Sequence, residues 1–262
     1  MQSTYPHTER TAWPYPRLFA HRGAGHIAPE NTLAAMRVGH QLGYGAVEFD
    51  AKLSRDAIAL LMHDDTLERT TNGHGAFRDF DASALLRLDA GAWHSQGFAG
   101  EPIPTLADVL RYLGDNGMVA DVEIKPCPGR GAETGEVVAR ELAAYLQASP
   151  HAASQFFVSS FSVDALRAAQ SVAPQVPRTL LAERYDPSCD ALLQSLGCRT
   201  FATDHAALTP DLVAHMHASG YWVMAYTIND VARAREALGW GVDAIFTDAL
   251  TDMAAAFPTR HR

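Results

Sequence analysis

Three acidic residues occur in short apolar segments, with a spacing that suits a shared site. Glu48 and Asp50 stand two residues apart, and Glu123 stands two residues before Lys125. Residues two apart on a β-strand point to the same face. Clustered carboxylates repel one another, and a hard divalent cation such as Mg2+ or Ca2+ relieves that repulsion. The pattern predicts a cation held by the three acids. The alternative is a buried ionic layer in which each acid pairs with lysine or arginine.

Two histidines directly follow apolar runs, where a strand would meet a polar loop. They are His21, after Leu-Phe-Ala, and His63, after Leu-Leu-Met. Histidine is the side chain best suited to proton transfer near neutral pH, so both are candidates for acid–base catalysis. Each alone could instead be a core histidine with satisfied hydrogen bonds. Arg22 brings positive charge beside His21, and His205 ranks lower because no acid pair accompanies it.

The run Gly23-Ala-Gly25-His-Ile-Ala28 satisfies a loose dinucleotide-binding fingerprint. In a genuine fingerprint the helix begins within the glycine run, so that its amides face the pyrophosphate. Here we expect Pro29-Glu30 to form the first turn of a helix after the run, where the acid would repel phosphate. The sequence contains no G-x-S-x-G, H-E-x-x-H or Walker motif. Metal-assisted acid–base chemistry is therefore the favoured interpretation.

Short apolar runs alternate with amphipathic segments along the whole chain, which indicates a parallel sheet with crossover helices. Eight such units over about 240 residues predict a closed (β/α)8 TIM barrel, whose active site lies at the carboxyl ends of the strands. The expected strands are Leu18–His21, Ala46–Leu53, Val119–Ile124, Phe156–Phe161, Thr179–Ala182, Thr200–Thr203, Trp222–Ile228 and Ala244–Thr247. The expected helices are Glu30–Leu42, Leu106–Leu113, Glu133–Leu146, Val163–Ser171, Pro187–Leu196, Pro210–Ser219, Asp230–Leu238 and a short one after Asp248.

One apolar run, Ala57–Met62, exceeds the eight barrel strands. Only Ser54-Arg55-Asp56 separates it from the second strand, and three residues cannot hold a crossover helix. We therefore expect a hairpin arm that opens a long insertion over about residues 54–104, because loops of this length are usually functional or form a small subdomain. The length suits one domain over residues 1–262.

The composition is that of a globular protein, with 47% apolar and 19% charged residues and a net charge of −9. This acidic balance argues against a nucleic-acid binder. The three cysteines, Cys127, Cys189 and Cys198, form neither a disulfide framework nor a CxxC metal site. Met1–Arg10 lacks the apolar core of a signal peptide, and no apolar run approaches the roughly 20 residues of a membrane span. These features predict a cytoplasmic protein without stable membrane association.

Short motifs in a fixed order resemble the glycerophosphodiester phosphodiesterase family, in particular the bacterial cytoplasmic enzymes linked to glycerol-3-phosphate uptake. The resemblance covers nearly the whole chain. The motifs are His21-Arg-Gly23, Pro29-Glu-Asn-Thr32, Glu48-Phe-Asp50, His63-Asp-Asp65, Leu67-Glu-Arg-Thr-Thr-Asn-Gly73, Glu123-Ile-Lys125, Ser159-Ser-Phe161, Ala225-Tyr-Thr-Ile-Asn229 and Ile245-Phe-Thr-Asp248.

The resemblance implies a (β/α)8 barrel with an insertion after the second strand. It implies that Glu48, Asp50 and Glu123 hold a divalent cation, Mg2+ or Ca2+. It further implies that His21 and His63 are general acid and base, and that Arg22 and Lys125 contact the phosphate of a small glycerophosphodiester. The chain departs from the family pattern at Asp56-Ala57, where Asp-Gly is usual, and at Tyr226, where many members carry Trp.

The expected reaction is hydrolysis through a cyclic phosphate to sn-glycerol 3-phosphate and an alcohol. Phe161 and Tyr226, at two other strand ends, are candidates to wall the glycerol side of the pocket, with plain barrel packing as the alternative. Two other functions stay open: a related phospholipase acting on lipid headgroups, and a catalytically silent barrel that binds a phosphorylated ligand. The sequence leaves undetermined the oligomeric state, the preferred headgroup, the metal and the order in which the histidines act.

Overall fold

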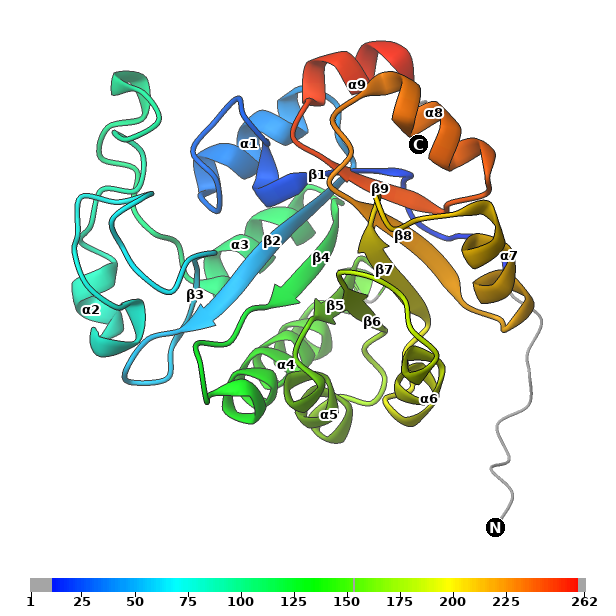
Figure 1. Cartoon of the computed structure of the whole chain (residues 1–262). Coiled ribbons are helices and arrows are strands. Elements are labelled where there is room, and N and C mark those ends of the chain that lie inside the picture. Colours follow the sequence, from blue (N-terminus) through cyan, green and yellow to red (C-terminus); the bar gives the residue numbers. More distant parts are fainter. Residues whose placement is uncertain (1–10, 153, 259–262) are drawn as a thin grey trace.

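The computed structural model describes residues 11–152 and 154–258 (Figure 1), so the segment Met1–Arg10 lies outside the described residues. Over the described ranges, nine strands form one sheet in the order β1-β9-β8-β7-β6-β5-β4-β2-β3, and β1 also pairs with β2. All the pairings except that of β3 are parallel, so eight strands close into the predicted barrel. The strands are β1 Leu18–Ala20, β2 Ala46–Leu53, β3 Ala59–Leu61, β4 Val119–Ile124, β5 Phe156–Ser160, β6 Arg178–Ala182, β7 Thr200–Asp204, β8 Trp222–Tyr226 and β9 Ala244–Thr247.

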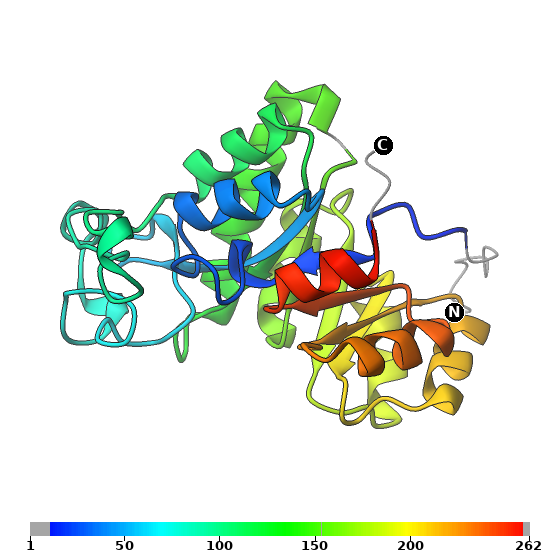
Figure 2. The ribbon, with the colours of Figure 1, turned by 90° about the horizontal axis from the view of Figure 1, so that it is seen from above.

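Helices follow the barrel strands and cover the outside of the sheet (Figures 1 and 2). Side-chain caps fix several of their starts: Thr209 accepts a hydrogen bond from the Leu212 amide, and Asp230 accepts one from the Arg233 amide. The helices are α1 Leu33–Gln41, α2 Ala82–Leu85, α3 Leu106–Asp115, α4 Gly131–Ala148, α5 Val163–Val172, α6 Ser188–Ser195, α7 Pro210–Ala218, α8 Val231–Gly239 and α9 Leu250–Ala256.

The expected start of the first helix is wrong. Helix α1 begins at Leu33, with Thr32 as its N-cap, and Pro29-Glu30 does not form its first turn. The reason lies in Asn31, whose φ of 58° is left-handed and therefore interrupts a helix. The Thr32 side chain then accepts from the Ala35 amide, which restarts the backbone in helical geometry. Glu30 is thus left in the loop, where its carboxylate is available to other side chains.

The glycine run that resembles a dinucleotide fingerprint has a packing role. Residues His21–Gly23 form a short 3-10 turn, and the helix does not begin within the run, as predicted. Gly25 has a φ of 55°, and a Cβ on it would lie 2.3 Å from the Asp248 backbone. Only glycine allows the loop after β1 to approach the end of β9 this closely.

The insertion is confirmed as a hairpin arm with a small core of its own. Strand β3 pairs antiparallel with β2, with Ala51 opposite Leu61, and the turn between them places Ala57 at a φ of 60°. The following chain, which includes α2 and the short 3-10 turns Phe77–Asp79 and Gln96–Phe98, projects beside the barrel (Figures 1 and 2). Its apolar cluster contains Leu60, Met62, Leu67, Phe77, Ala82, Leu85, Ala90 and Ile103.

The barrel interior changes from apolar to polar along its axis. Its apolar cluster includes Phe19, Phe157, Leu181 and Phe246, whose side chains are almost fully buried. Above this layer, towards the carboxyl ends of the strands, the inward positions of β2 and β4 are acidic. None of the helices in the described ranges is long and apolar enough to cross a membrane.

Candidate active site

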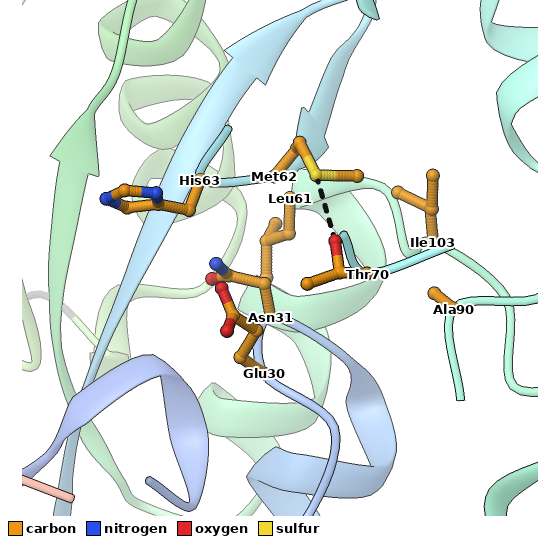
Figure 3. Close-up of a pocket in the computed structure, with 8 residues that line it drawn as sticks. All are labelled: Glu30, Asn31, Leu61, Met62, His63, Thr70, Ala90 and Ile103. Carbon is orange, nitrogen blue, oxygen red and sulfur yellow. Dashed lines mark hydrogen bonds between the residues drawn. The ribbon is translucent and has the colours of Figure 1, made fainter. Parts of the chain in front are cut away.

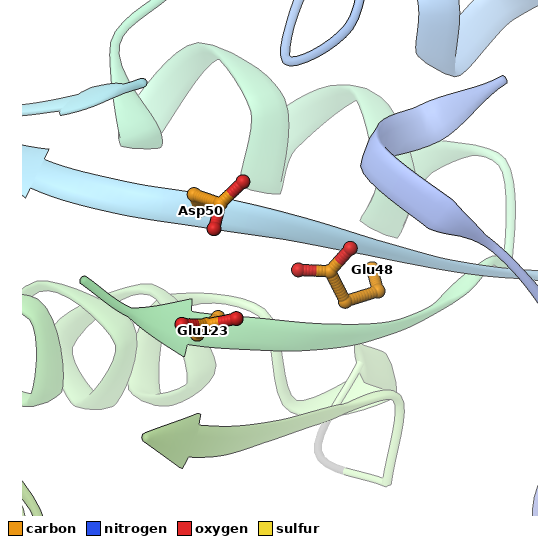
Figure 4. Close-up of side chains that lie close together, drawn as sticks. All are labelled: Glu48, Asp50 and Glu123. Atoms are coloured by element: carbon orange, nitrogen blue, oxygen red, sulfur yellow. The ribbon is translucent and has the colours of Figure 1, made fainter. Parts of the chain in front are cut away.

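The three predicted metal-ligating acids converge inside the barrel mouth (Figure 4). Glu48 and Asp50 lie on β2 and Glu123 lies on β4, where Asp50 and Glu123 are partners in the strand register. One carboxylate oxygen from each acid lies within 4.8 Å of those of the other two. All three side chains are buried, and Glu48 Oε1 has no hydrogen-bond partner. Three buried carboxylates with oxygens this close together, one of them with an oxygen that lacks a partner, fit a bound divalent cation.

The charge around the acids is not balanced by their basic neighbours. Burial and the charge of Asp50 raise the pKa of Glu48 to about 8 and that of Glu123 to about 7. Burial opposes ionisation of Asp50 too, but Lys125 and Arg22 hold its pKa well below the ordinary value. Lys125 Nζ lies 2.8 Å from Glu123 and 3.5 Å from Asp50, whereas Glu48 forms no ion pair with either cation among the contacts of the described residues. The ionic-layer alternative therefore leaves Glu48 without a lysine or arginine partner, and leaves its Oε1 without any hydrogen bond.

Two residues of the β1–α1 loop with left-handed backbone, Arg22 and Asn31, form hydrogen bonds with these acids. Arg22 adopts a left-handed φ of 52°, and its amide donates to Glu48 Oε2 at 3.1 Å. Asn31, also left-handed, donates from its side chain to Asp50 Oδ2 at 2.8 Å and accepts from the Asp50 amide at 3.0 Å. The unusual backbone of the β1–α1 loop thus turns two donors towards the carboxylates.

His21 lies between two acids at the end of β1. Its Nδ1 is 2.7 Å from Asp248 Oδ1, and its Nε2 is 3.8 Å from Glu48 Oε2. Asn229 fixes Asp248 through bonds of 3.0 Å and 2.7 Å to its side chain and amide. Burial lowers the pKa of His21, but the bond to Asp248 and the charge of Glu48 outweigh it, so the pKa is raised. Sequence reasoning gave Asp248 no role, although its place at the end of the last strand, beside β1 in a closed barrel, was a usable signal.

His63 is held by a chain of alternating charges that begins in the insertion. Its Nδ1 lies 2.7 Å from Asp64 Oδ1, and both Asp64 oxygens accept from Arg69, at 2.6 and 2.8 Å. Arg69 also donates to both oxygens of Glu30, at 2.6 and 2.8 Å. Glu30 in turn accepts from Arg22 at 2.7 Å. Burial lowers the pKa of His63, whereas the pKa of His21 is raised, so His21 holds a proton more readily than His63 does.

Figure 3 shows the residues that line a small void where the insertion meets the β1–α1 loop, with His63 among them. A void of about 10 Å3 lies between the loop residues Glu30 and Asn31 and the insertion. This is at most the space of one water molecule. Within the insertion, the Thr70 hydroxyl donates to Met62 Sδ at 3.5 Å. The bonds from Arg69 to Glu30 cross the seam and tie the insertion to the barrel beside His63.

The larger cavity of the barrel mouth has a volume of about 200 Å3. Asp50 lies beside it within the acidic cluster, and the cavity is lined by the other predicted site residues. These are His21, Arg22, Glu48, His63, Glu123, Lys125, Phe161 and Tyr226. His205 does not line it and instead contacts Arg233 through its ring and its carbonyl.

Two aromatic rings form one wall of this cavity. Phe161 and Tyr226 meet edge to face with ring centroids 5.7 Å apart, and the Tyr226 hydroxyl donates to the Ala182 carbonyl at 2.9 Å. Lys125 Nζ lies 5.5 Å from the Phe161 ring centroid. Phe161 is 43% exposed, so it is not plain barrel packing. The wall can therefore offer an apolar face to a bound molecule.

Asp121 is a buried acid that sequence reasoning missed, because it lies in the middle of an apolar strand. It stands two residues before Glu123, on the same face of β4, and is fully buried. Burial raises its pKa well above the ordinary value. The nearby Ser159 hydroxyl offsets part of this shift, although the two side chains do not reach hydrogen-bond geometry.

The aromatic residues of the insertion do not form a continuous exposed ridge. Phe77 is fully buried, and Phe80 packs against the core of the insertion. Trp93 is 41% exposed, and its ring meets that of His94, which in turn meets Phe98. Ile58 and Leu86 are the other large apolar side chains that the described part of the insertion exposes, and neither is aromatic.

The sequence model of the glycerophosphoryl diester phosphodiesterase family matches residues 21–251. The chain belongs to this family. It is 30% identical over 234 residues to a glycerophosphodiester phosphodiesterase of Caldanaerobacter subterraneus subsp. tengcongensis, covering 88% of this chain and 93% of that protein. It is accordingly an enzyme of the phosphoric diester hydrolase class.

Solved structures of the family share the fold. A phosphodiesterase of Oleispira antarctica, in complex with the product sn-glycerol-3-phosphate, superposes with a TM-score of 0.84 at 32% identity. The match covers 94% of this chain and 98% of that one. A glycerophosphodiester phosphodiesterase of Agrobacterium tumefaciens gives a TM-score of 0.75 at 28% identity, covering 91% of this chain and 99% of that one.

Proposed function

We propose that this enzyme hydrolyses small glycerophosphodiesters to sn-glycerol 3-phosphate and a free alcohol. The observation that carries the proposal is that two carboxylate-bonded histidines and three clustered acids surround one cavity of substrate size. The similarity to the Oleispira antarctica protein, which was crystallised with sn-glycerol-3-phosphate, supports the same product here. We propose that residues 1–262 act as one domain, with the 54–104 insertion as part of the site. The cytoplasmic location stays a prediction.

The proposed site residues divide into three groups. Glu48, Asp50 and Glu123 would hold a divalent cation, Mg2+ or Ca2+, through carboxylate oxygens. When bound, such a cation neutralises charge on a phosphoryl oxygen and lowers the pKa of a hydroxyl. Arg22 and Lys125 would contact the phosphate, because their charged groups face the same cavity. Phe161 and Tyr226 would wall the glycerol side.

His21 and His63 would move the protons of both steps. One histidine takes the proton of the glycerol 2-hydroxyl as that oxygen bonds to phosphorus. The bond from phosphorus to the alcohol oxygen breaks, and the other histidine protonates the departing oxygen. Water then opens the cyclic phosphate while the histidines exchange roles. Asp248 and Asp64, each 2.7 Å from an Nδ1, orient the rings so that each Nε2 is free for this transfer.

The decisive assay measures sn-glycerol 3-phosphate release from glycerophosphocholine and glycerophosphoethanolamine, coupled to glycerol-3-phosphate dehydrogenase. We expect EDTA to abolish turnover and Mg2+ or Ca2+ to restore it. We expect His63→Ala to lower kcat by about 10²–10⁴ with the fold retained. The matched control is His205→Ala, a strand-end histidine away from the cavity. Product release that ignores both EDTA and the His63 change would contradict the proposal.

A further inference from the structure

Beside the acidic cluster, the cavity is lined by a second group of polar atoms, on residues that lie in register with Glu48 and Glu123. Both carboxylate oxygens of Asp121 and the hydroxyl of Ser159 are buried, line the cavity, and have no hydrogen-bond partner. Asp121 and Ser159 have no exposed surface. They lie on the adjacent strands β4 and β5, where Asp121 pairs in register with Phe157 and Glu123 pairs with Ser159.

The Ser159 hydroxyl lies near the Asp121 carboxylate but does not reach hydrogen-bond geometry, so both side chains keep unused hydrogen-bonding capacity. Buried polar atoms in folded proteins are nearly always hydrogen-bonded, and one left unpaired costs about 1–3 kcal/mol. Across the strand register the neighbours of Asp121 are Glu48 and Phe157, and those of Ser159 are Glu123 and Thr179. None of them forms a hydrogen bond with the Asp121 carboxylate or the Ser159 hydroxyl. Because both residues line the cavity, a molecule bound there can supply the missing hydrogen bonds.

We propose that Asp121 and Ser159 bind the free primary hydroxyl of the substrate's glycerol moiety. The inference rests on the proposed function, in which the phosphate and the 2-hydroxyl lie at the level of Glu123. Asp121 lies two residues deeper on the same strand face, and two residues of a strand span about 6.6 Å. The primary hydroxyl, on the carbon next to the 2-hydroxyl, extends over part of this distance, and a hydrogen bond to the Asp121 carboxylate covers the rest. The pair would thus distinguish a glycerol ester from an ester that lacks that hydroxyl.

A second cation is the less suitable occupant. The group of acids whose oxygens lie close enough to share an ion consists, in the described part of the chain, of Glu48, Asp50 and Glu123. Asp121 is not a member of it. One carboxylate and one hydroxyl match the donor and acceptor of an alcohol, since the hydroxyl hydrogen is donated to Asp121 and its oxygen accepts from Ser159.

The test compares two chromogenic substrates with the same leaving group. They are 2,3-dihydroxypropyl 4-nitrophenyl phosphate and 2-hydroxypropyl 4-nitrophenyl phosphate, which differ only in the primary hydroxyl. We expect the enzyme to favour the dihydroxy substrate in kcat/KM by about tenfold to a hundredfold, the worth of hydrogen bonds that include a carboxyl group. Equal kcat/KM values would overturn this inference alone. Hydrolysis of neither ester, nor of glycerophosphocholine, would overturn the proposed function instead.

Variants test which residues give the preference for the dihydroxy substrate. We expect Ser159→Ala and Asp121→Ala to reduce the ratio of the two kcat/KM values to within about threefold of unity. Asp121→Asn should retain part of the preference for the dihydroxy substrate, because an amide still bonds a hydroxyl. The matched control is Thr179→Val on β6, which removes another buried hydroxyl without a partner, one that does not line the cavity. A purely structural role would lower both activities equally and leave the ratio unchanged. That result, or the same loss of ratio in the Thr179 control, would refute the assignment.

Discussion

The contact between Asp248 and His21 gives the most quantitative prediction. Burial raises the pKa of the Asp248 carboxyl, but its hydrogen bond to His21 and the charge of that ring outweigh burial and lower the pKa from 3.8 to about 2. At 1.36 kcal/mol per pKa unit, the fold favours the charged over the protonated carboxyl by about 2 kcal/mol more than the unfolded chain does. The Asp248 side chain is only 17% exposed, so solvent screens this interaction little.

Replacing Asp248 with Asn removes that charge while keeping the side-chain shape. If the same interaction stabilises the protonated His21 in the transition state, the loss of about 2 kcal/mol lowers kcat about thirtyfold. We expect KM to change little, because Asp248 acts through His21 and does not line the cavity. We also expect the His21 pKa, followed by NMR, to fall, since the hydrogen bond and the negative charge that raise it are lost.

The same variant has a defined effect on stability against pH. A carboxyl whose folded pKa is depressed stabilises the fold above its unfolded pKa, and this contribution disappears as the pH falls through the folded pKa. The gap in unfolding free energy between the natural chain and Asp248→Asn should be about 2 kcal/mol at neutral pH and shrink between about pH 4 and pH 2. Urea denaturation measures it. The control is Asp230→Asn, a nearby acid that caps α8 and does not touch His21. An unchanged kcat together with a pH-independent gap would refute the reasoning.

Three further changes test other parts of the structure. Ala57→Gly should raise the unfolding free energy, measured in urea, by about 0.5–1 kcal/mol, because glycine adopts the left-handed φ of 60° without the penalty of a Cβ. Equal or lower stability would show that the turn is not strained. Arg69→Gln should lower kcat about tenfold, because Asp64 loses the partner that holds it against His63. Arg69→Lys should not restore kcat, because only a guanidinium group bonds both Asp64 and Glu30. Full activity in the Lys variant would assign the effect to charge alone. The raised pKa of His21 suits it to act as the acid that protonates the departing alcohol. His21→Ala should therefore lose less kcat on a 4-nitrophenyl ester than on glycerophosphocholine, because nitrophenolate leaves without a proton. Equal losses on both esters would assign the role of the acid to another group.

The sequence by itself determined the barrel and the location of the acids. Strand faces repeat every two residues, so Glu48 and Asp50 had to share a face wherever their strand lay. The carboxyl ends of parallel strands meet at one rim, which brought Glu123 and His21 into the same prediction. The three-residue spacing before Ala57–Met62 likewise excluded a crossover and left only a hairpin. These inferences rest on local backbone geometry, which a short segment carries with it.

Only the tertiary structure decided which side chains support the site. Asp248 bonds His21 across 227 residues of chain, and that contact exists because β9 and β1 close the barrel. Arg69 in the insertion bonds Glu30, 39 residues before it in the chain. Helix α1 begins later than expected because Asn31, which bonds Asp50, has a left-handed backbone. Contacts of this kind depend on the path of the whole backbone and on which neighbours compete for each polar atom. A local sequence pattern contains neither kind of information. The sequence therefore predicts the reacting groups, whereas the tertiary structure determines which side chains they bond.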